Sequence, residues 1–274
     1  MFTRAVPAVV LGLTIACSSY AQPAQTMFPG TSDTKAVYDN VNTGPMRTTL
    51  TSENKFPETG QLELGGFFQH AEQTEDLEQD SFGVYARYGL WENVTFGAAV
   101  PFVDSEFNDE SNSGLGDVVL SLDLLAYQDI FRYPFVIPHV DVGLPTGDED
   151  EGLGTGETVI NFGLSVGTKV YDQLTYVIDL SYAFNGALDV PGDNVAYLSG
   201  SLVWDISDRF AAFVEGRAYD KNTLDDYPYL VEAGLSYMLT RDVMITGYGG
   251  TLSIDENGES ESYDIAGARV AVQF

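Results

Sequence analysis

The chain has 274 residues, of which 44% are hydrophobic and 12% aromatic, and it carries 12 basic against 41 acidic side chains. A net charge of −29 repels a phosphate backbone, which excludes nucleic acid as a partner. The aromatic content argues against a disordered chain, and beyond residue 21 no apolar run approaches the ~18 residues of a membrane-spanning helix.

Residues 1–21 predict a signal peptide. Arg4 supplies a basic start, residues 5–16 form a short apolar core, and residues 19–21 provide the small side chains that a signal peptidase needs. A lipoprotein site at Cys17 is less favoured, because Thr14 stands where such sites usually have Leu. Cleavage after Ala21 would remove the chain's single cysteine, so the exported protein needs no disulfide.

Residues 22–60 contain isolated apolar residues with no sustained period, which predicts an irregular N-terminal arm. Two interpretations of this arm stay open. It is either a disordered tail or a plug that folds back into a pore.

From residue 61 to residue 274, apolar and polar positions alternate with a period of two. In residues 174–184 every second position is apolar, and the intervening positions include Asp179. Such alternation is typical of a strand with one apolar and one polar face. We predict twelve strands, at residues 61–70, 81–90, 94–103, 115–127, 133–144, 158–170, 174–184, 195–206, 209–219, 228–239, 243–254 and 263–274.

The connections between these strands alternate in length. Five are short, at residues 91–93, 128–132, 171–173, 207–208 and 240–242. Six are longer, at residues 71–80, 104–114, 145–157, 185–194, 220–227 and 255–262. The longer connections contain more than half of the acidic residues and one basic residue, Lys221, so the two ends of the strand array differ in charge.

An even number of strands with alternating connection lengths predicts a 12-stranded antiparallel up-and-down transmembrane β-barrel of the outer membrane, spanning residues 61–274. Strands can cross a bilayer only when the sheet closes, because lipid leaves no water for unpaired backbone groups. Short turns and both termini would then lie in the periplasm, with the acidic loops outside beside lipopolysaccharide. A soluble β-sandwich is the alternative, since it also alternates apolar and polar faces.

The last strand ends on Phe274 and has apolar residues at alternate positions before it. This ending resembles the signal by which the outer-membrane insertion machinery selects its substrates. Aromatic residues near strand ends, such as Trp91 and Trp204, fit an interfacial belt at the short-turn side.

With the apolar face directed to lipid, ten charged residues face inward and are the candidate lumen-lining residues. They are Glu63, Arg87, Asp123, Asp141, Lys169, Asp179, Glu215, Arg217, Glu232 and Arg269. They either pair with one another and hold the barrel shut, or form a narrow polar constriction that selects permeants. The same face carries aromatic rings that would suit small aromatic solutes, at Phe67, Tyr85, Tyr127, Phe135, Tyr197 and Tyr219.

Three glycine-rich stretches, at residues 114–125, 140–148 and 152–157, resemble the MetA-pathway-of-phenol-degradation family of outer-membrane β-barrel transporters. The match is most specific over residues 114–186. The resemblance implies a role in uptake of aromatic or other hydrophobic compounds and provides no binding residues to transfer. The acidic insertion at residues 148–151 departs from the family pattern, which puts the substrate class in doubt.

The sequence offers little that suggests an enzyme, a cofactor or a built metal site. His70 lies at a strand-loop junction and His139 shares a face with Asp141, and neither stands in a phospholipase motif. Residues 148–152 fail as an EF-hand loop because Gly152 is fifth rather than sixth. The acidic loops are either a solvated, self-repelling face or a diffuse site for Ca²⁺ or Mg²⁺.

Two functions therefore follow from the sequence. The first is an outer-membrane channel or facilitator for passive uptake of small solutes of unknown identity. The second is a non-conducting structural or adhesive barrel with a filled lumen.

Overall fold

The computed structural model describes residues 21–24, 38–41, 57–73, 77–107, 110–128, 134–148, 151, 153–171, 173–184, 194–220, 229–256 and 259–274. Over these ranges the regular structure consists of β-strands, and no helix there is long and apolar enough to span a membrane. Residues 1–20 lie outside them, so the signal peptide stays a prediction.

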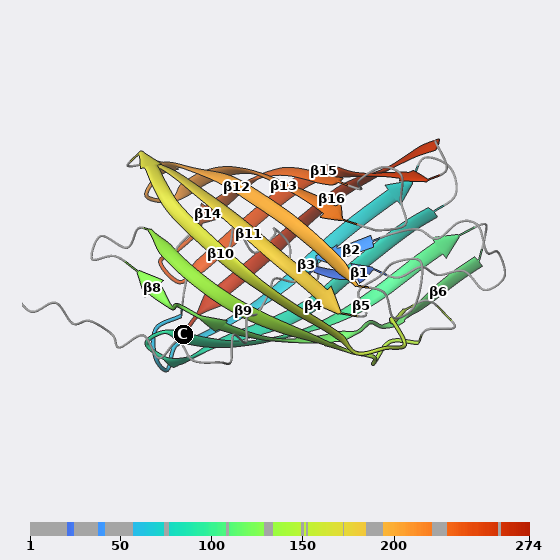
Figure 1. The fold of residues 1–274 in the computed structure, drawn as a ribbon, viewed down its shortest axis with the longest axis horizontal. Helices are drawn as coiled ribbons and strands as arrows, with labels where there is room; N and C mark the ends of the chain where they lie inside the picture. The colour runs from blue at the N-terminus through green and yellow to red at the C-terminus, as the bar shows by residue number, and fades with distance from the viewer. Residues whose placement is uncertain are drawn as a thin grey trace, which may run out of the picture.

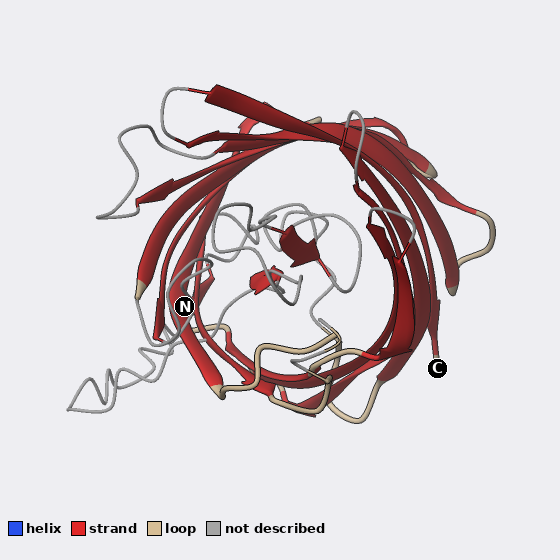
Figure 2. Cartoon of the chain, turned by 90° about the vertical axis from the view of Figure 1, so that its right-hand side faces the viewer, coloured by secondary structure: helices blue, strands red, loops and turns tan. Residues whose placement is uncertain are grey.

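The wall of the molecule is a closed antiparallel β-barrel of twelve strands over the described residues, as the sequence predicts. Its segments are β3 (Leu62–Gln73), β4 (Leu77–Trp91), β5 (Val94–Phe107), β6 (Glu110–Leu115), β7 (Val118–Leu124), β8 (Tyr127–Gln128), β9 (Phe135–Leu144), β10 (Val159–Tyr171), β11 (Leu174–Phe184), β12 (Val195–Ser207), β13 (Phe210–Asp220), β14 (Tyr229–Met238), β15 (Val243–Glu256) and β16 (Glu259–Gln273). Sequential strands pair around the ring, and β16 pairs with β3 to close it (Figures 1 and 2).

The fourth wall strand is broken into three segments. β6 and β7 pair with successive parts of β5, and β7 and β8 with successive parts of β9. Between β7 and β8 the chain advances four residues, from Asp123 to Tyr127, while its partner advances three, from His139 to Val136. This extra residue is a bulge that reverses the direction of the next side chain. Tyr127 is therefore 52% exposed, and its predicted inward position is wrong.

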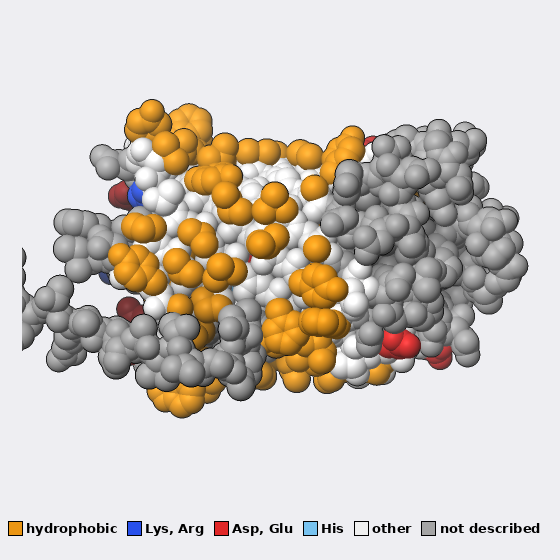
Figure 3. Space-filling view, viewed as in Figure 1, with side chains coloured by type: hydrophobic (Ala, Val, Ile, Leu, Met, Phe, Trp, Pro, Cys, Tyr) orange, Lys and Arg blue, Asp and Glu red, His pale blue; other side chains and the backbone are white. Residues whose placement is uncertain are grey.

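The two faces of the wall differ as the period of two requires. In β11 the burial alternates strictly from Thr175 onward, with Asp179 buried and Leu180 60% exposed. Because the wall is a single layer, the buried face is the inner one. Apolar side chains cover the middle of the outer surface (Figure 3).

Exposed aromatic rings lie toward both ends of this outer apolar surface. At the short-turn end they include Trp91, Tyr171 and Trp204. At the acidic end Tyr182 and Phe184 pack edge to face, with ring centroids 4.9 Å apart. Two such girdles flanking an apolar band are typical of barrels embedded in lipid.

Three of the predicted long loops are wrong over most of their length, because strand pairing extends into them. β3 and β4 pair as far as Gln73 and Leu77, β5 and β6 as far as Phe107 and Glu110, and β15 and β16 as far as Glu256 and Glu259. These hairpins project at the end of the barrel that carries the acids. Outside lipid the outer face of a strand is solvated and carries acids such as Asp104 and Glu106, so the apolar alternation that identifies a strand in the sequence is lost there.

The segment before the barrel contains one structure that the sequence did not predict. β1 (Ala21–Ala24) pairs antiparallel with β2 (Tyr38–Val41), and both lie within the barrel outline in the two ribbon views (Figures 1 and 2). Most of residues 22–56 lies outside the described ranges, so the choice between tail and plug stays open.

The chain reaches the wall across its inner surface. The peptide of Pro57 and Glu58 passes over Gly89, which belongs to the buried face of β4. A Cβ atom at residue 89 would lie 2.0 Å from the carbonyl oxygen of Glu58, so this crossing needs glycine there.

The outer face gives a test of lipid contact. We expect Leu180→Arg, in the middle of β11, to lower the free energy of unfolding in phospholipid vesicles by about 2–4 kcal/mol, because it places a charge near the bilayer midplane. Leu239→Arg, beside a short turn, should cost only about 0–1 kcal/mol. Urea unfolding followed by tryptophan fluorescence measures both, and equal losses would contradict a lipid-facing wall.

Candidate functional site

Nine of the ten predicted lumen-lining residues are buried on the inner face of the wall, each at most 5% exposed. The exception is Lys169 near the end of β10, whose side chain is 33% exposed and whose Nζ lies 3.7 Å from Oδ2 of Asp205. The other nine fall into local groups, of which the largest joins four residues on β16, β3, β4 and β7.

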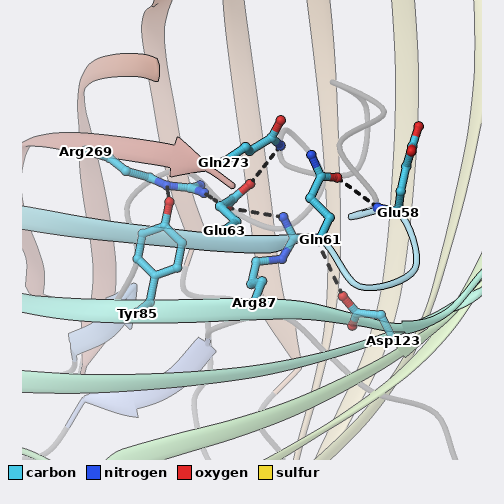
Figure 4. Close-up of polar contacts among 8 residues, drawn as sticks. All are labelled: Glu58, Gln61, Glu63, Tyr85, Arg87, Asp123, Arg269 and Gln273. Carbon is cyan, nitrogen blue, oxygen red and sulfur yellow. Dashed lines mark hydrogen bonds and ion pairs between the residues drawn. The ribbon is translucent and has the colours of Figure 1, made fainter. Parts of the chain in front are cut away.

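That group is centred on Glu63 and is shown in Figure 4. Arg269 Nη2 donates to Glu63 Oε1 over 3.1 Å, and Arg87 Nη1 lies 3.6 Å from the same oxygen. Arg87 Nη2 in turn lies 4.0 Å from Oδ2 of Asp123. Gln273 Nε2 donates to the second oxygen of Glu63 over 3.3 Å. Two guanidinium groups thus balance two carboxylates on β16, β3, β4 and β7.

Tyr85 completes this group. Its hydroxyl accepts a hydrogen bond of 2.6 Å from Arg269 Nε, and its ring centroid lies 4.5 Å from Cζ of Arg269. Gly65 leaves room for the ring, because a Cβ there would meet it at 2.2 Å. The cation lies against both the hydroxyl and the aromatic face, which fixes its position on the inner wall.

This group lies at the seam where the barrel closes. Glu63 is on β3 and Arg269 on β16, so their hydrogen bond bridges the seam where the first and last wall strands meet. Phe67, Tyr85, Ala99, Met244 and Ala271 are among the buried residues that pack together beside it. The network therefore stabilises the closed barrel and also places charged groups on its inner face.

A second group lies on β13 and β14. Glu215 and Glu232 are direct cross-strand partners, and each is only 1% exposed. Arg217 follows two residues after Glu215 on the same face, and its Cζ lies 5.2 Å from the centroid of the Tyr197 ring. This side of the inner wall thus carries two neighbouring acids and one cation beside an aromatic ring.

A third group surrounds Asp179 on β11. Its Oδ2 lies 2.5 Å from His139 Nε2 and accepts a hydrogen bond of 2.5 Å from Ser165 Oγ. Ser181 donates to the other carboxylate oxygen. Asp141, two residues after His139, faces Asn161 across the ladder and is also buried.

The arrangement of this third group does not match a nucleophilic triad. A triad places the carboxylate on one imidazole nitrogen and the nucleophile on the other. Ser165 Oγ lies 3.3 Å from His139 Nε2, the nitrogen that already contacts Asp179. His139 is fully buried. Its contacts and those of Asp179 join the neighbouring strands β9, β10 and β11.

Sequence reasoning missed one polar centre, at Asp117 in the gap between β6 and β7. The carboxylate of Asp117 accepts hydrogen bonds from the backbone N–H groups of Thr146, Gly147 and Thr155 and from the Thr155 hydroxyl, at 2.7–3.0 Å. Thr146 Oγ1 accepts a hydrogen bond from Val118 N and donates one to Gly116 O. These two bonds satisfy backbone groups at the break between β6 and β7.

The described part of the acidic loop at 145–157 is therefore latched to the wall. Leu153 is buried, and a Cβ on Gly147 would lie 2.2 Å from its carbonyl oxygen. Gly147 is thus required for close packing of the loop. Asp117 stands in the same glycine-rich stretch that carries the family resemblance, which is the one signal that marks it in the sequence.

Comparison with known proteins settles the family. The family model described as "Putative MetA-pathway of phenol degradation" matches residues 51–265, which is most of the chain and the whole barrel except the end of β16. The chain belongs to this family. The resemblance seen in residues 114–186 thus extends over the whole barrel. Among curated protein sequences nothing matches the chain.

Solved structures support the fold of this family member. An outer membrane channel from Pseudomonas putida F1 superposes with a TM-score of 0.65 at 13% identity, over 79% of this chain and 96% of that chain. The translocator domain of the autotransporter NalP from Neisseria meningitidis gives 0.53 at 14% identity, over 83% and 94%. The KdgM porin, solved with disordered oligogalacturonate, gives 0.51 at 12% identity, over 75% and 97%. At these identities the likeness shows a shared outer-membrane barrel architecture.

The seam network predicts a large effect for loss of one partner. Arg269→Ala leaves Glu63 buried with one of its two cations removed, and we expect a loss of about 3–5 kcal/mol in the free energy of unfolding. The double variant Arg269→Met with Glu63→Met should recover most of it, because both buried charges then disappear. Urea unfolding in vesicles tests this, and a double variant as unstable as Arg269→Ala would contradict it.

The latch at Asp117 predicts a local effect. Asp117→Ala removes the acceptor of four hydrogen bonds, so residues 145–157 should become sensitive to thermolysin near Leu153, with a stability loss of at least about 2 kcal/mol. Glu157→Gln alters an exposed side chain of the same loop and should leave both unchanged. Equal cleavage of the two variants would argue against the latch.

Proposed function

We propose that this protein is an outer-membrane channel or facilitator for passive uptake of small solutes, with aromatic or other hydrophobic compounds as the substrate class. The observation that carries the proposal is the inner face, where buried charges alternate with aromatic rings inside a wall that is apolar outside. Family membership agrees with it, because the family is described by a pathway of phenol degradation.

The inner groups suit an amphipathic or aromatic solute. Guanidinium Cζ atoms lie 4.5 Å from the ring centroid of Tyr85 and 5.2 Å from that of Tyr197, so each position combines an aromatic ring with a nearby fixed charge. A phenol needs both an apolar surface for its ring and a polar partner for its hydroxyl. We infer that these two positions are steps on the solute's path.

The charge of the inner face predicts which solutes the channel would favour. Its nine buried ionic residues are six carboxylates and three guanidinium groups, as named above. A surplus of acid favours cations and neutral molecules over anions. We therefore propose that these residues line the lumen and make the channel prefer cations to anions.

The barrel also has an expected orientation in the membrane. We infer that the short-turn end, where Phe274 is 70% exposed, lies in the periplasm with both termini. The acidic hairpins then face outward beside lipopolysaccharide, and the last strand is the segment that the insertion machinery binds. The division of outer-membrane barrels into short periplasmic turns and longer external loops supports this orientation.

We further propose that the protein is not an enzyme. His139, Ser165 and Asp179 are the described residues that come nearest to a catalytic set, and their contacts converge on one imidazole nitrogen. The alternative function, a non-conducting structural or adhesive barrel, is favoured if the ion pairs merely fill the lumen.

Single-channel recording separates these functions. Refolded protein in planar bilayers should give conductance steps and a reversal potential of cation-selective sign in a KCl gradient. The double variant Glu215→Gln with Glu232→Gln should lower cation preference severalfold, because it removes two adjacent inner charges. Asp264→Asn, which lies on the outer face, is the matched control. Bilayers without steps, together with liposomes impermeable to phenols and sugars, would establish the non-conducting alternative.

A further inference from the structure

We propose that the β3–β4 hairpin holds a site for one divalent transition-metal ion of the zinc class, with His70, Glu78 and Asp80 as its protein ligands. The site lies on the outer face of the wall at the acidic end of the barrel, away from the inner groups described above. It is independent of whether the barrel conducts.

The geometry of the three side chains carries the proposal. One ligand atom from each of His70, Glu78 and Asp80 can be chosen so that all three lie within 4.8 Å of one another. His70 Nδ1 lies 2.9 Å from Asp80 Oδ1 and 3.9 Å from Glu78 Oε1. Tetrahedral coordination at Zn–O and Zn–N distances near 2.1 Å needs ligand atoms ~3.4 Å apart, so a small side-chain adjustment is sufficient.

The strand register holds these residues in place. His70 and Asp80 are direct cross-strand partners, and Glu78 lies two residues before Asp80 on the same face of β4. Glu72 stands opposite Glu78, and its Oε2 lies 3.9 Å from Nε2, the other ring nitrogen of His70, so it adds negative charge beside the site without belonging to the ligand set. Ligands fixed by a paired ladder lose less conformational freedom on binding than ligands on a loop.

The surrounding charge favours a bound cation. Asp104 lies directly opposite Asp80, Glu106 opposite Glu78, and Asp264 opposite Glu72. Like charges directly opposite each other destabilise a sheet, and together with Glu72 and Glu78 four such pairs border the histidine. No basic residue occupies these flanking register positions. A divalent ion would relieve the repulsion that the sequence otherwise places on three successive strand pairs.

The presence of an imidazole distinguishes this site from the diffuse attraction of an acidic surface. Calcium and magnesium prefer oxygen ligands alone, whereas one nitrogen with two or three carboxylate oxygens suits zinc and its neighbours in the first transition row. His70 is the one histidine of the described acidic end, and its side chain is 32% exposed, so an ion can reach it from water. Because the protein ligands all come from one side, the ion keeps an open position toward the solvent.

The test is Zn²⁺ titration of the full refolded barrel in detergent, by isothermal calorimetry and by competition with a chromophoric chelator. We expect one equivalent of bound Zn²⁺, an upward shift of the thermal unfolding midpoint, and no comparable effect of Ca²⁺. His70→Gln and Asp80→Asn should each weaken binding at least tenfold. Heat-modifiable migration on a gel confirms that each variant still forms a barrel.

Glu106→Gln is the matched control, since it removes one acid of the same surface outside the proposed ligand set. It should weaken Zn²⁺ binding less than threefold. Absence of a stoichiometric phase, or equal losses for His70→Gln and Glu106→Gln, would overturn the proposal in favour of nonspecific attraction by the acidic hairpins. Equal affinity for Ca²⁺ would overturn it as well.

Discussion

Every other feature of this protein depends on one hydrogen-bonded seam. Eleven wall strands pair with neighbours that follow them in sequence, but β16 pairs with β3, the first strand of the wall. Without that pairing two strands would present unpaired backbone groups to lipid, which no transmembrane sheet tolerates. The seam is reinforced from inside by the hydrogen bond between Arg269 and Glu63, which are 206 residues apart in sequence.

Closure also determines what the inner face can hold. A single-layer cylinder must direct every second side chain inward, and nine ionic residues are buried there as a result. Buried charges are costly unless they are paired. The contacts of Glu63 with two arginines show that pairing. Glu215 and Glu232 lie directly opposite each other on β13 and β14. The residues for which we propose a role in selectivity are thus the same ones whose pairing bears on stability.

The sequence predicts the strands well because lipid imposes the period of two on every residue that crosses it. The alternation in residues 174–184 matches the burial of β11 from Thr175 onward. The prediction fails where that constraint ends. The hairpins of β3 with β4 and of β15 with β16 extend into acidic segments whose composition resembles loops, since an outer face in water needs no apolar residues. One inserted residue before Tyr127 reverses its direction, and a bulge has no signature in the alternation itself.

The candidate site is likewise predictable from the sequence only in part. Which charges face inward is a local property of each strand, and nine of the ten predicted residues are buried. Which charges meet is a property of register around the whole ring, so the contact of Arg269 with Tyr85 could not be predicted from either segment alone. The latch at Asp117 could not be predicted from its own strand either, because its donors come from residues 29 to 38 positions later.

The separation of the two strands that form the seam has a kinetic consequence. The ladder between β16 and β3 is the contact of greatest sequence separation in the wall, and loop-closure entropy makes such contacts slow to form. Until the last strand reaches the first, the nascent sheet has two open edges, which are templates for association with other chains. Closure between β16 and β3 is therefore expected to be slower than formation of the hairpins in the middle of the chain.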